Sequence, residues 1–248
     1  MLLKSEINSD IGCVRANNED MILFGGEFFR DRSAKQIFEL SDTARFAAIV
    51  ADGMGGHNGG EFASEIALRC FDDFILDLPE GLDEGEIASS LKRWTDETHH
   101  LILRKSHELP ECEGMGSTFC GLLFYGKTVF ALNIGDSRLY RFRGGILKQL
   151  TTDHSIRQLT GDLSQASNQI YNSLGAGESA FIDIRNLSGQ ILEDDLFLIC
   201  SDGLCDMLPD EETERILTEN PSAEALVTAA KNVGGKDNIS VILLKIVS

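Results

Sequence analysis

The chain has 248 residues, and its 40 acidic side chains outnumber its 22 basic ones to give a formal net charge of −18. This acidity repels a phosphate backbone and argues against a nucleic-acid binder, but it leaves divalent cations and basic partner surfaces as ligands. Apolar residues make up 42% of the chain, enough for a folded core. No run approaches the roughly 18 apolar residues of a membrane span.

The six cysteines are scattered along the chain and include no Cys-x-x-Cys pair. This favours reduced thiols in a cytoplasmic protein over a disulfide framework or a zinc site.

Strands are predicted where β-branched, aromatic and other apolar residues run between turn residues. In chain order these are 4–11, 21–24, 45–51, 117–125, 128–134, 138–143, 181–186, 196–200 and 238–247. Helices are predicted where apolar residues recur at helical spacing, and these are 61–78, 84–107, 210–219 and 222–233. The polar segment 27–43 is predicted to be a solvated loop. The chain shows no linker or repeat, so we expect residues 1–248 to form one domain.

Short turns between successive strands predict antiparallel hairpins, and the helices fall into two separate pairs. Both features indicate an α+β fold in which helices cover sheet faces. Residues 121–128 match the nucleotide-binding P-loop pattern letter for letter. That pattern needs a helix after it, whereas a strand is predicted here, so Gly126-Lys127 is interpreted as a hairpin turn.

The histidines outside the glycine-rich segments are predicted to have ordinary roles. His99, His100 and His107 lie on the second predicted helix and are expected to face solvent. His154 is interpreted as a loop or helix-start residue rather than a metal ligand.

Acidic residues stand at the ends of several predicted strands, beside glycine. The set is Glu19, Asp20, Asp52, Asp136, Asp202 and Asp237. Carboxylates at buried strand ends repel one another unless cations compensate them, and all-oxygen ligation suits Mg²⁺ or Mn²⁺. Each acid alone is best read as a turn residue. Together with Arg15, which carries a phosphate-binding fork, and His57, which can protonate a leaving group, the set favours phosphoryl chemistry.

These motifs resemble those of the metal-dependent type 2C Ser/Thr protein phosphatases, in particular the bacterial branch. Seven segments carry the resemblance in family order, and they are 12–20, 50–61, 116–118, 133–138, 150–155, 201–204 and 236–238. The resemblance implies a four-layer αββα sandwich, two antiparallel β-sheets flanked by pairs of helices. It also implies a two-metal site at one edge of the sandwich.

The resemblance assigns a role to each acidic position. Asp52 would bridge two Mn²⁺ or Mg²⁺ ions, and the Gly53 carbonyl would bind one of them. Asp202 and Asp237 would hold the first ion. Glu19 and Asp20 would hold the second, partly through water. Asp136 would join Asp202 in a third metal site, so the resemblance implies two core ions and allows a third.

The resemblance also implies the reaction, which is hydrolysis of phosphoserine and phosphothreonine in proteins through in-line attack of a metal-bridging hydroxide. Arg15 would bind the substrate phosphate, and His57 would be the general acid for the leaving oxygen. The expected partners are phosphoproteins, including a Ser/Thr kinase and its targets, and the expected oligomeric state is a monomer.

The chain departs from the bacterial pattern in the flap region, about 155–174, which looks shortened. Residues 171–175, Tyr-Asn-Ser-Leu-Gly, stand where a His-Pro and an arginine are usual. Two alternatives remain. A catalytically weak regulatory or binding module on the same fold should lack a metal aspartate, and none is missing here. A hydrolase of small phosphate esters would use the same residues, so the sequence does not separate it from a protein phosphatase.

Overall fold

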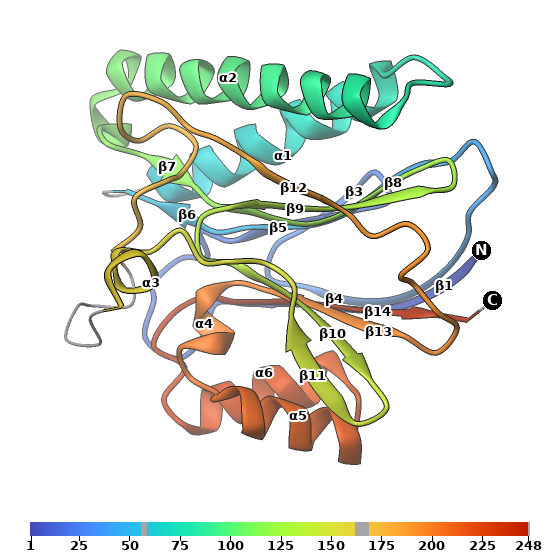
Figure 1. Cartoon of the computed structure of the whole chain (residues 1–248). Coiled ribbons are helices and arrows are strands. Elements are labelled where there is room, and N and C mark those ends of the chain that lie inside the picture. The colour runs from blue at the N-terminus through green and yellow to red at the C-terminus, as the bar shows by residue number, and fades with distance from the viewer. Residues whose placement is uncertain (56–58, 162–168, 248) are drawn as a thin grey trace.

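Two six-stranded β-sheets form the centre of the molecule (Figure 1). The structure is a computed structural model that describes residues 1–55, 59–161 and 169–247. Sheet A has the strand order β11 (Ile146–Gln149), β10 (Arg138–Arg143), β13 (Leu196–Cys200), β14 (Ile239–Ile246), β1 (Leu2–Asp10) and β4 (Ser33–Glu39). Sheet B has the order β12 (Asp183–Asn186), β9 (Thr128–Ile134), β8 (Phe119–Tyr125), β5 (Arg45–Ala51), β2 (Met21–Phe24) and β3 (Glu27–Phe29).

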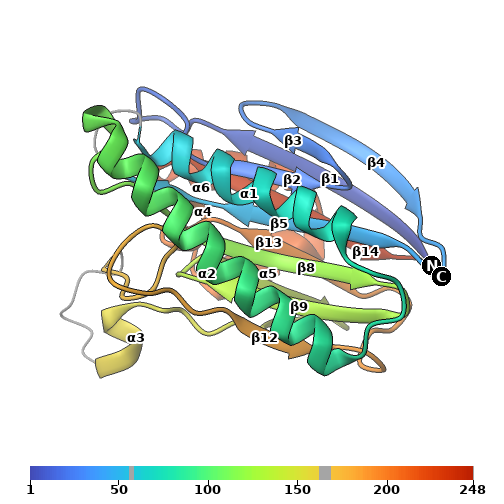
Figure 2. The same cartoon turned by 90° about the horizontal axis from the view of Figure 1, so that it is seen from above.

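Helices cover the outer faces of both sheets, which gives four layers. α1 (Gly59–Asp77) and α2 (Glu84–Glu108) lie over sheet B, as the view from above shows (Figure 2). α5 (Asp210–Glu219) and α6 (Ala223–Asn232) lie against sheet A (Figure 1). Neighbouring strands in both sheets pair antiparallel throughout the described residues. The predicted αββα sandwich, with two antiparallel sheets flanked by pairs of helices, is therefore confirmed.

Short elements connect these layers near one edge of the sandwich. They are β6 (Gly53–Met54), β7 (Gly116–Ser117), η1 (Pro110–Cys112), α3 (Ile156–Thr160) and α4 (Asp202–Cys205). β6 pairs with β7, which sets the end of β5 beside the start of β8. The predicted strand 117–125 is thus divided at Thr118 into β7 and β8.

Apolar side chains fill all three spaces between the layers. Between the sheets, the Phe24 ring lies 4.9 Å from Phe46 and packs against it edge-to-face. Between sheet B and its helices, Phe71 of α1 lies 4.7 Å from Phe119 of β8 and 4.9 Å from Trp94 of α2. Edge-to-face aromatic pairs add stability beyond the apolar area that they bury, so these contacts fix α1 and α2 on sheet B.

The structure corrects the prediction that residues 27–43 form a solvated loop. Residues 27–29 and 33–39 form β3 and β4, the edge strands of sheets B and A. Along β4, exposed and partly buried residues alternate, so Ile37 is exposed while the Phe38 ring contacts Phe24 at 5.6 Å. This alternation buries too few apolar residues for the strand to be recognised in isolation.

A second correction concerns His99, which is buried rather than facing solvent. Its Nδ1 atom accepts a hydrogen bond of 3.1 Å from the backbone N–H of Gly175, because the segment after residue 169 crosses over α2. His100 and His107 are exposed, as predicted.

Two further expectations are confirmed. All six cysteines are free thiols. Gly126 and Lys127 form the turn of the β8–β9 hairpin, so the P-loop pattern has the wrong structural context. Among the described residues, no helix combines the length and the apolar character needed to cross a bilayer.

Candidate metal centre and phosphate site

The antiparallel arrangement brings several strand ends to one edge of the sandwich, opposite the two termini (Figure 1). Asp20 directly precedes β2, and Asp52 directly follows β5. Asp202 opens α4 after β13, and Asp237 lies just before β14. Asp136 lies in the turn between β9 and β10. Alternating strand direction therefore gathers acids that are up to 217 residues apart in the sequence (237 − 20).

Asp20 is buried and held by small polar side chains. Its Oδ2 atom accepts a hydrogen bond of 2.7 Å from the Ser201 hydroxyl, and its backbone N–H donates to Asn18 Oδ1. The second carboxylate oxygen, Oδ1, is buried and has no hydrogen-bond partner in the structure. Asp202 Oδ1 is also buried and also has no hydrogen-bond partner. A buried carboxylate oxygen without a partner is costly, so a ligand of positive charge would stabilise each of these atoms.

Thr118 fixes the backbone at Asp52. The Thr118 hydroxyl accepts from the Asp52 N–H at 2.9 Å, and the Thr118 N–H donates to the Asp52 carbonyl at 2.9 Å. The same hydroxyl lies 2.8 Å from that of Ser137, which follows Asp136. One threonine therefore links the backbone of Asp52 to the side chain of Ser137, the neighbour of Asp136.

Gly53 lies where no side chain would fit. A Cβ atom there would lie 2.0 Å from the Gly60 carbonyl oxygen and 2.6 Å from that of Glu19. A Cβ on Gly60 would in turn lie 2.8 Å from the Glu19 carboxyl carbon. This close approach sets the Gly53 backbone beside the Glu19 side chain.

Asn238 ties the N-terminal loop to the start of β14. Its Oδ1 atom accepts from the Glu19 N–H at 2.8 Å, and its Nδ2 atom donates to the carbonyls of Ile11 and Asn17, each at 3.0 Å. The loop carries Arg15, whose guanidinium forms an ion pair of 2.6 Å with Asp237. The Arg15 side chain is 47% exposed, so it stands at the rim of the carboxylate group.

The acids raise one another's proton affinity. Burial, with Asp202 and Asp237 nearby, raises the pKa of Asp20 to about 7. Burial and then Asp202 raise the pKa of Asp136 to about 8, and burial and then Asp237 raise that of Asp202 to about 6. The pKa of Asp52 is also raised well above its ordinary value, by burial and then by the charge of Asp20. Crowded carboxylates of this kind hold protons or cations.

The donor set fits a hard divalent cation. Its members are carboxylates, a backbone carbonyl beside them and hydroxyls that fix the carboxylates, and it includes the two buried oxygens without partners. In the described residues, no three His, Cys, Asp or Glu side chains already surround one point closely enough to hold an ion. Asp237, for instance, is turned to Arg15.

A cleft of about 330 Å³ opens beside this group. It is lined by Asp136 and Asp202 and by residues of the segment that begins at Asp153. Arg138 in its wall forms an ion pair of 2.6 Å with Asp153.

Comparison with known proteins identifies the family. The sequence profile described as protein phosphatase 2C matches residues 25–241. The chain belongs to the protein phosphatase 2C family. It is 34% identical to the serine/threonine phosphatase Stp of Listeria monocytogenes serotype 4b, over 98% of this chain and 96% of that protein. This confirms the family and the enzyme class that the motifs predict.

Solved structures of family members share the fold. A serine/threonine phosphatase of S. agalactiae superposes with a TM-score of 0.81 at 26% identity, covering 98% of this chain and 99% of that one. The catalytic domain of the phosphatase PstP, solved in complex with two manganese ions, has a TM-score of 0.74 at 28% identity and full coverage of both chains.

Within this 2C phosphatase fold, most of the predicted site residues come together. Arg15, Glu19, Asp20, Asp52, Gly53, Asp136, Asp202 and Asp237 all lie at the one edge described above. His57 lies outside the described residues, and so do residues 162–168 of the flap region.

Sequence reasoning did not assign the residues that hold the acids in place. They are four buried small polar residues next to a predicted acid or a glycine-rich turn, namely Asn18, Thr118, Ser201 and Asn238. Their adjacency in Asn18-Glu19-Asp20, Ser201-Asp202 and Asp237-Asn238 was the available signal, since a buried polar side chain beside a carboxylate needs a partner.

Proposed function

We propose that this protein is a divalent-metal-dependent phosphatase that removes phosphate from phosphoserine and phosphothreonine in proteins. The observation that carries the proposal is the carboxylate group at the sheet edge. Acids from both sheets lie together there with raised pKa values and with two buried oxygens that have no partner. Family membership supports the same activity.

The acids divide into ligands of different ions. We assign Asp52 and the Gly53 carbonyl to the centre of the site, Asp202 and Asp237 to the first ion, and Glu19 and Asp20 to the second. Asp136 and Asp202 would hold a third. The bound ions would supply an activated water and neutralise phosphoryl charge. The proximity of Asp52 to Asp20 and Asp202 supports this assignment.

Arg15 binds the substrate phosphate in this proposal. Its guanidinium is half-exposed at the rim. The hydrogen bond to Asp237 raises its pKa, and the charges of Glu19 and Asp52 add to that effect. A planar guanidinium can bind a phosphate through two parallel hydrogen bonds, which would orient the phosphoryl group over the acids. His57 is proposed as the general acid for the leaving oxygen on its sequence position alone.

The proposal extends to the domain organisation, the partners and the cellular location of the enzyme. Residues 1–248 are proposed to form one catalytic domain, which the pairing of β1 with β14 at the two chain ends supports. The proposed partners are a Ser/Thr kinase and its phosphorylated targets, met by a monomer. Six free thiols favour a reducing compartment, so we propose a cytoplasmic location.

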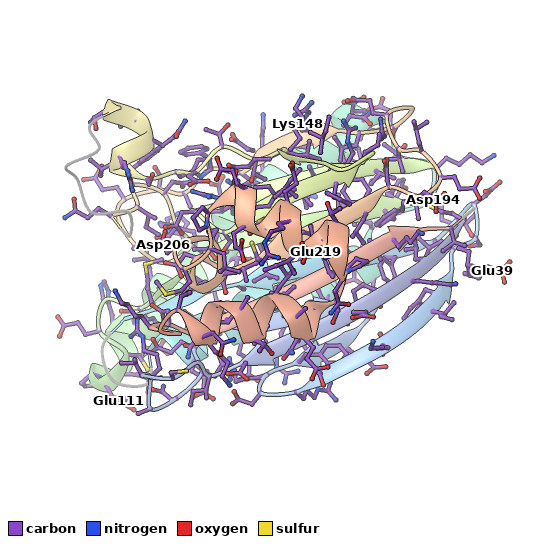
Figure 3. The ribbon with its side chains drawn as sticks, turned by 90° about the horizontal axis from the view of Figure 1, so that it is seen from below. Glu39, Glu111, Lys148, Asp194, Asp206 and Glu219 are labelled. Carbon is purple, nitrogen blue, oxygen red and sulfur yellow. The ribbon has the colours of Figure 1, made fainter. Side chains whose placement is uncertain are left out.

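The test is phosphate release from a phosphothreonine peptide by metal-stripped protein as Mn²⁺ is added back. We expect turnover to require Mn²⁺ and to fall at least about 100-fold in Asp202→Asn. The matched control is Asp194→Asn, which removes the same charge at the far end of the molecule, where Asp194 is exposed (Figure 3). No turnover by the folded wild type at millimolar Mn²⁺ would favour a binding module.

Substrate class is separated in the same assay. A protein phosphatase should prefer the phosphothreonine peptide to free phosphothreonine, because peptide contacts around the cleft contribute binding energy. Equal kcat/KM for the two substrates would favour a hydrolase of small phosphate esters.

A further inference from the structure

His154 is a buried side chain whose two ring nitrogens both have protein partners. The residue lies between β11 and α3 and is 2% exposed. Its Nδ1 atom lies 3.1 Å from the backbone nitrogen of Gly135 and 2.8 Å from Asn172 Nδ2. Its Nε2 atom lies 3.1 Å from a carboxylate oxygen of Asp183 on β12. Three segments that are distant in sequence thus meet at one imidazole.

These contacts decide which ring nitrogen carries the proton. The Gly135 N–H can only donate. The Asn172 amide is oriented by Phe181, because Oδ1 accepts from the Phe181 N–H at 3.0 Å and Nδ2 donates to the Phe181 carbonyl at 2.8 Å. Two donors therefore point at His154 Nδ1, which must accept. The proton then lies on Nε2 and is donated to Asp183.

His154 holds Gly135, the residue that precedes Asp136, through both of its backbone polar groups. The Gly135 N–H is bound by the imidazole, and the Gly135 carbonyl accepts from the His154 backbone N–H at 2.9 Å. Gly135 has a φ of +104°, and a Cβ there would lie 2.7 Å from the Thr118 side chain. Thr118 on one side and His154 on the other therefore leave the Gly135–Asp136 turn a single position.

We propose that His154, kept as its Nε2–H tautomer by Asn172 and Asp183, is a positioning residue that aims Asp136 at the carboxylate group. The inference rests on the proposed function for the role of Asp136 as an ion ligand. The proposal also assigns Asn172 a structural role, which is to orient the His154 ring. Asn172 lies in the segment that departs from the bacterial pattern. Hydrogen bonds behind a ligand commonly change metal affinity by about 10–100-fold when they are removed.

The first test is independent of catalysis. In metal-free protein labelled with ¹⁵N, long-range proton–nitrogen correlations report the protonation of each imidazole nitrogen. We expect His154 to carry its proton on Nε2 and the Gly135 amide to resist hydrogen exchange. A proton on His154 Nδ1 would overturn the proposal, whatever the protein's activity.

The second test compares two substitutions of the ring. In His154→Asn, the side-chain oxygen can occupy the Nδ1 position and accept from Gly135, whereas His154→Leu fills similar space without an acceptor. We expect the leucine variant to require about 10–100-fold more Mn²⁺ for half-maximal binding, measured by calorimetry, with protection of the Gly135 amide lost. The asparagine variant should recover most of the Mn²⁺ affinity and most of the Gly135 amide protection. KM for the peptide should change little in either variant.

The outcomes separate this proposal from the proposed function. Equal Mn²⁺ binding by the leucine variant and the wild type would overturn the positioning role. A wild type without phosphatase turnover would overturn the proposed function. If His154 still carried its proton on Nε2 and the leucine variant still bound Mn²⁺ more weakly than the asparagine variant and the wild type, the positioning of Asp136 would be supported.

Discussion

The space between the two sheets and the carboxylate edge are built from the same strands, but they contribute to stability with opposite signs. Between the sheets, Phe24 and Phe46 are buried and pack edge-to-face. A few residues farther along the same strands, burial and then neighbouring like charges raise the pKa values of Asp20 and Asp52. Apolar packing stabilises the fold, whereas the edge costs stability in exchange for a site that attracts cations.

The largest expected effect is on the apolar side of this comparison. Phe24→Ala should lower the free energy of unfolding by about 3–5 kcal/mol, because the ring is fully buried and its loss leaves a cavity between the sheets. Urea unfolding measures the change. Phe24→Leu should cost much less, and activity per folded molecule should remain, since Phe24 lies at the far end of β2 from Asp20. A cost below about 1 kcal/mol would show that this packing is not what stabilises the sandwich.

Sequence patterns correctly predicted the central strands of the two sheets, for a physical reason. Segments 45–51, 128–134 and 196–200 are apolar almost throughout and end at turn residues, so their prediction needs no knowledge of neighbours. The edge strand β4 differs, because it is stabilised by its register with β1 and by the Phe38 contact with Phe24. Those interactions do not appear in the local sequence, and the segment was wrongly predicted to be a loop.

In the site, too, some residues could be predicted from local sequence and others depend on partners that are distant in the chain. Acids beside glycine at strand ends identify the carboxylate group, since antiparallel connections bring those ends to one edge. The groups that orient the acids depend on partners across the fold, such as Asn238, which binds the Glu19 backbone 219 residues away. The roles of His154 and His99 depend likewise on a segment that crosses from the flap region. Composition and spacing do not contain this information.

The next expected effect is on the charged side of the comparison. Asp20 and Asp136 have folded-state pKa values of about 7 and about 8, against roughly 3.9 in an unfolded chain. Groups with raised values bind protons more tightly when folded, so their contribution to stability is complete below about pH 4 and is lost as the pH rises through 7 and 8. Each pH unit below a folded-state value is worth about 1.4 kcal/mol per group, so metal-free protein should lose on the order of 4 kcal/mol of unfolding free energy between about pH 6 and pH 9.

Chemical unfolding at a series of pH values measures this loss, and Asp136→Asn is its control. The amide keeps the size of the side chain but removes one charge from beside Asp202, so the variant should be more stable than the wild type at about pH 9 and show a flatter profile. Added Mn²⁺ should reverse the wild-type trend, because cation binding needs the deprotonated acids. A flat wild-type profile without metal would mean that the carboxylates do not destabilise the edge.

The smallest expected effect is in the exposed β8–β9 turn. Lys127 forms an ion pair of 2.9 Å with Asp42, but their side chains are 78% and 76% exposed, so water screens the pair. Lys127→Ala should therefore change the free energy of unfolding by about 0.5 kcal/mol or less and leave phosphatase activity unchanged. The same variant tests the P-loop match at residues 121–128, where this lysine would have to hold a nucleotide phosphate. Saturable ATP binding by the wild type that disappears in Lys127→Ala would contradict the hairpin assignment. An unaltered protein would show that a sequence pattern without its strand–loop–helix context carries no chemistry.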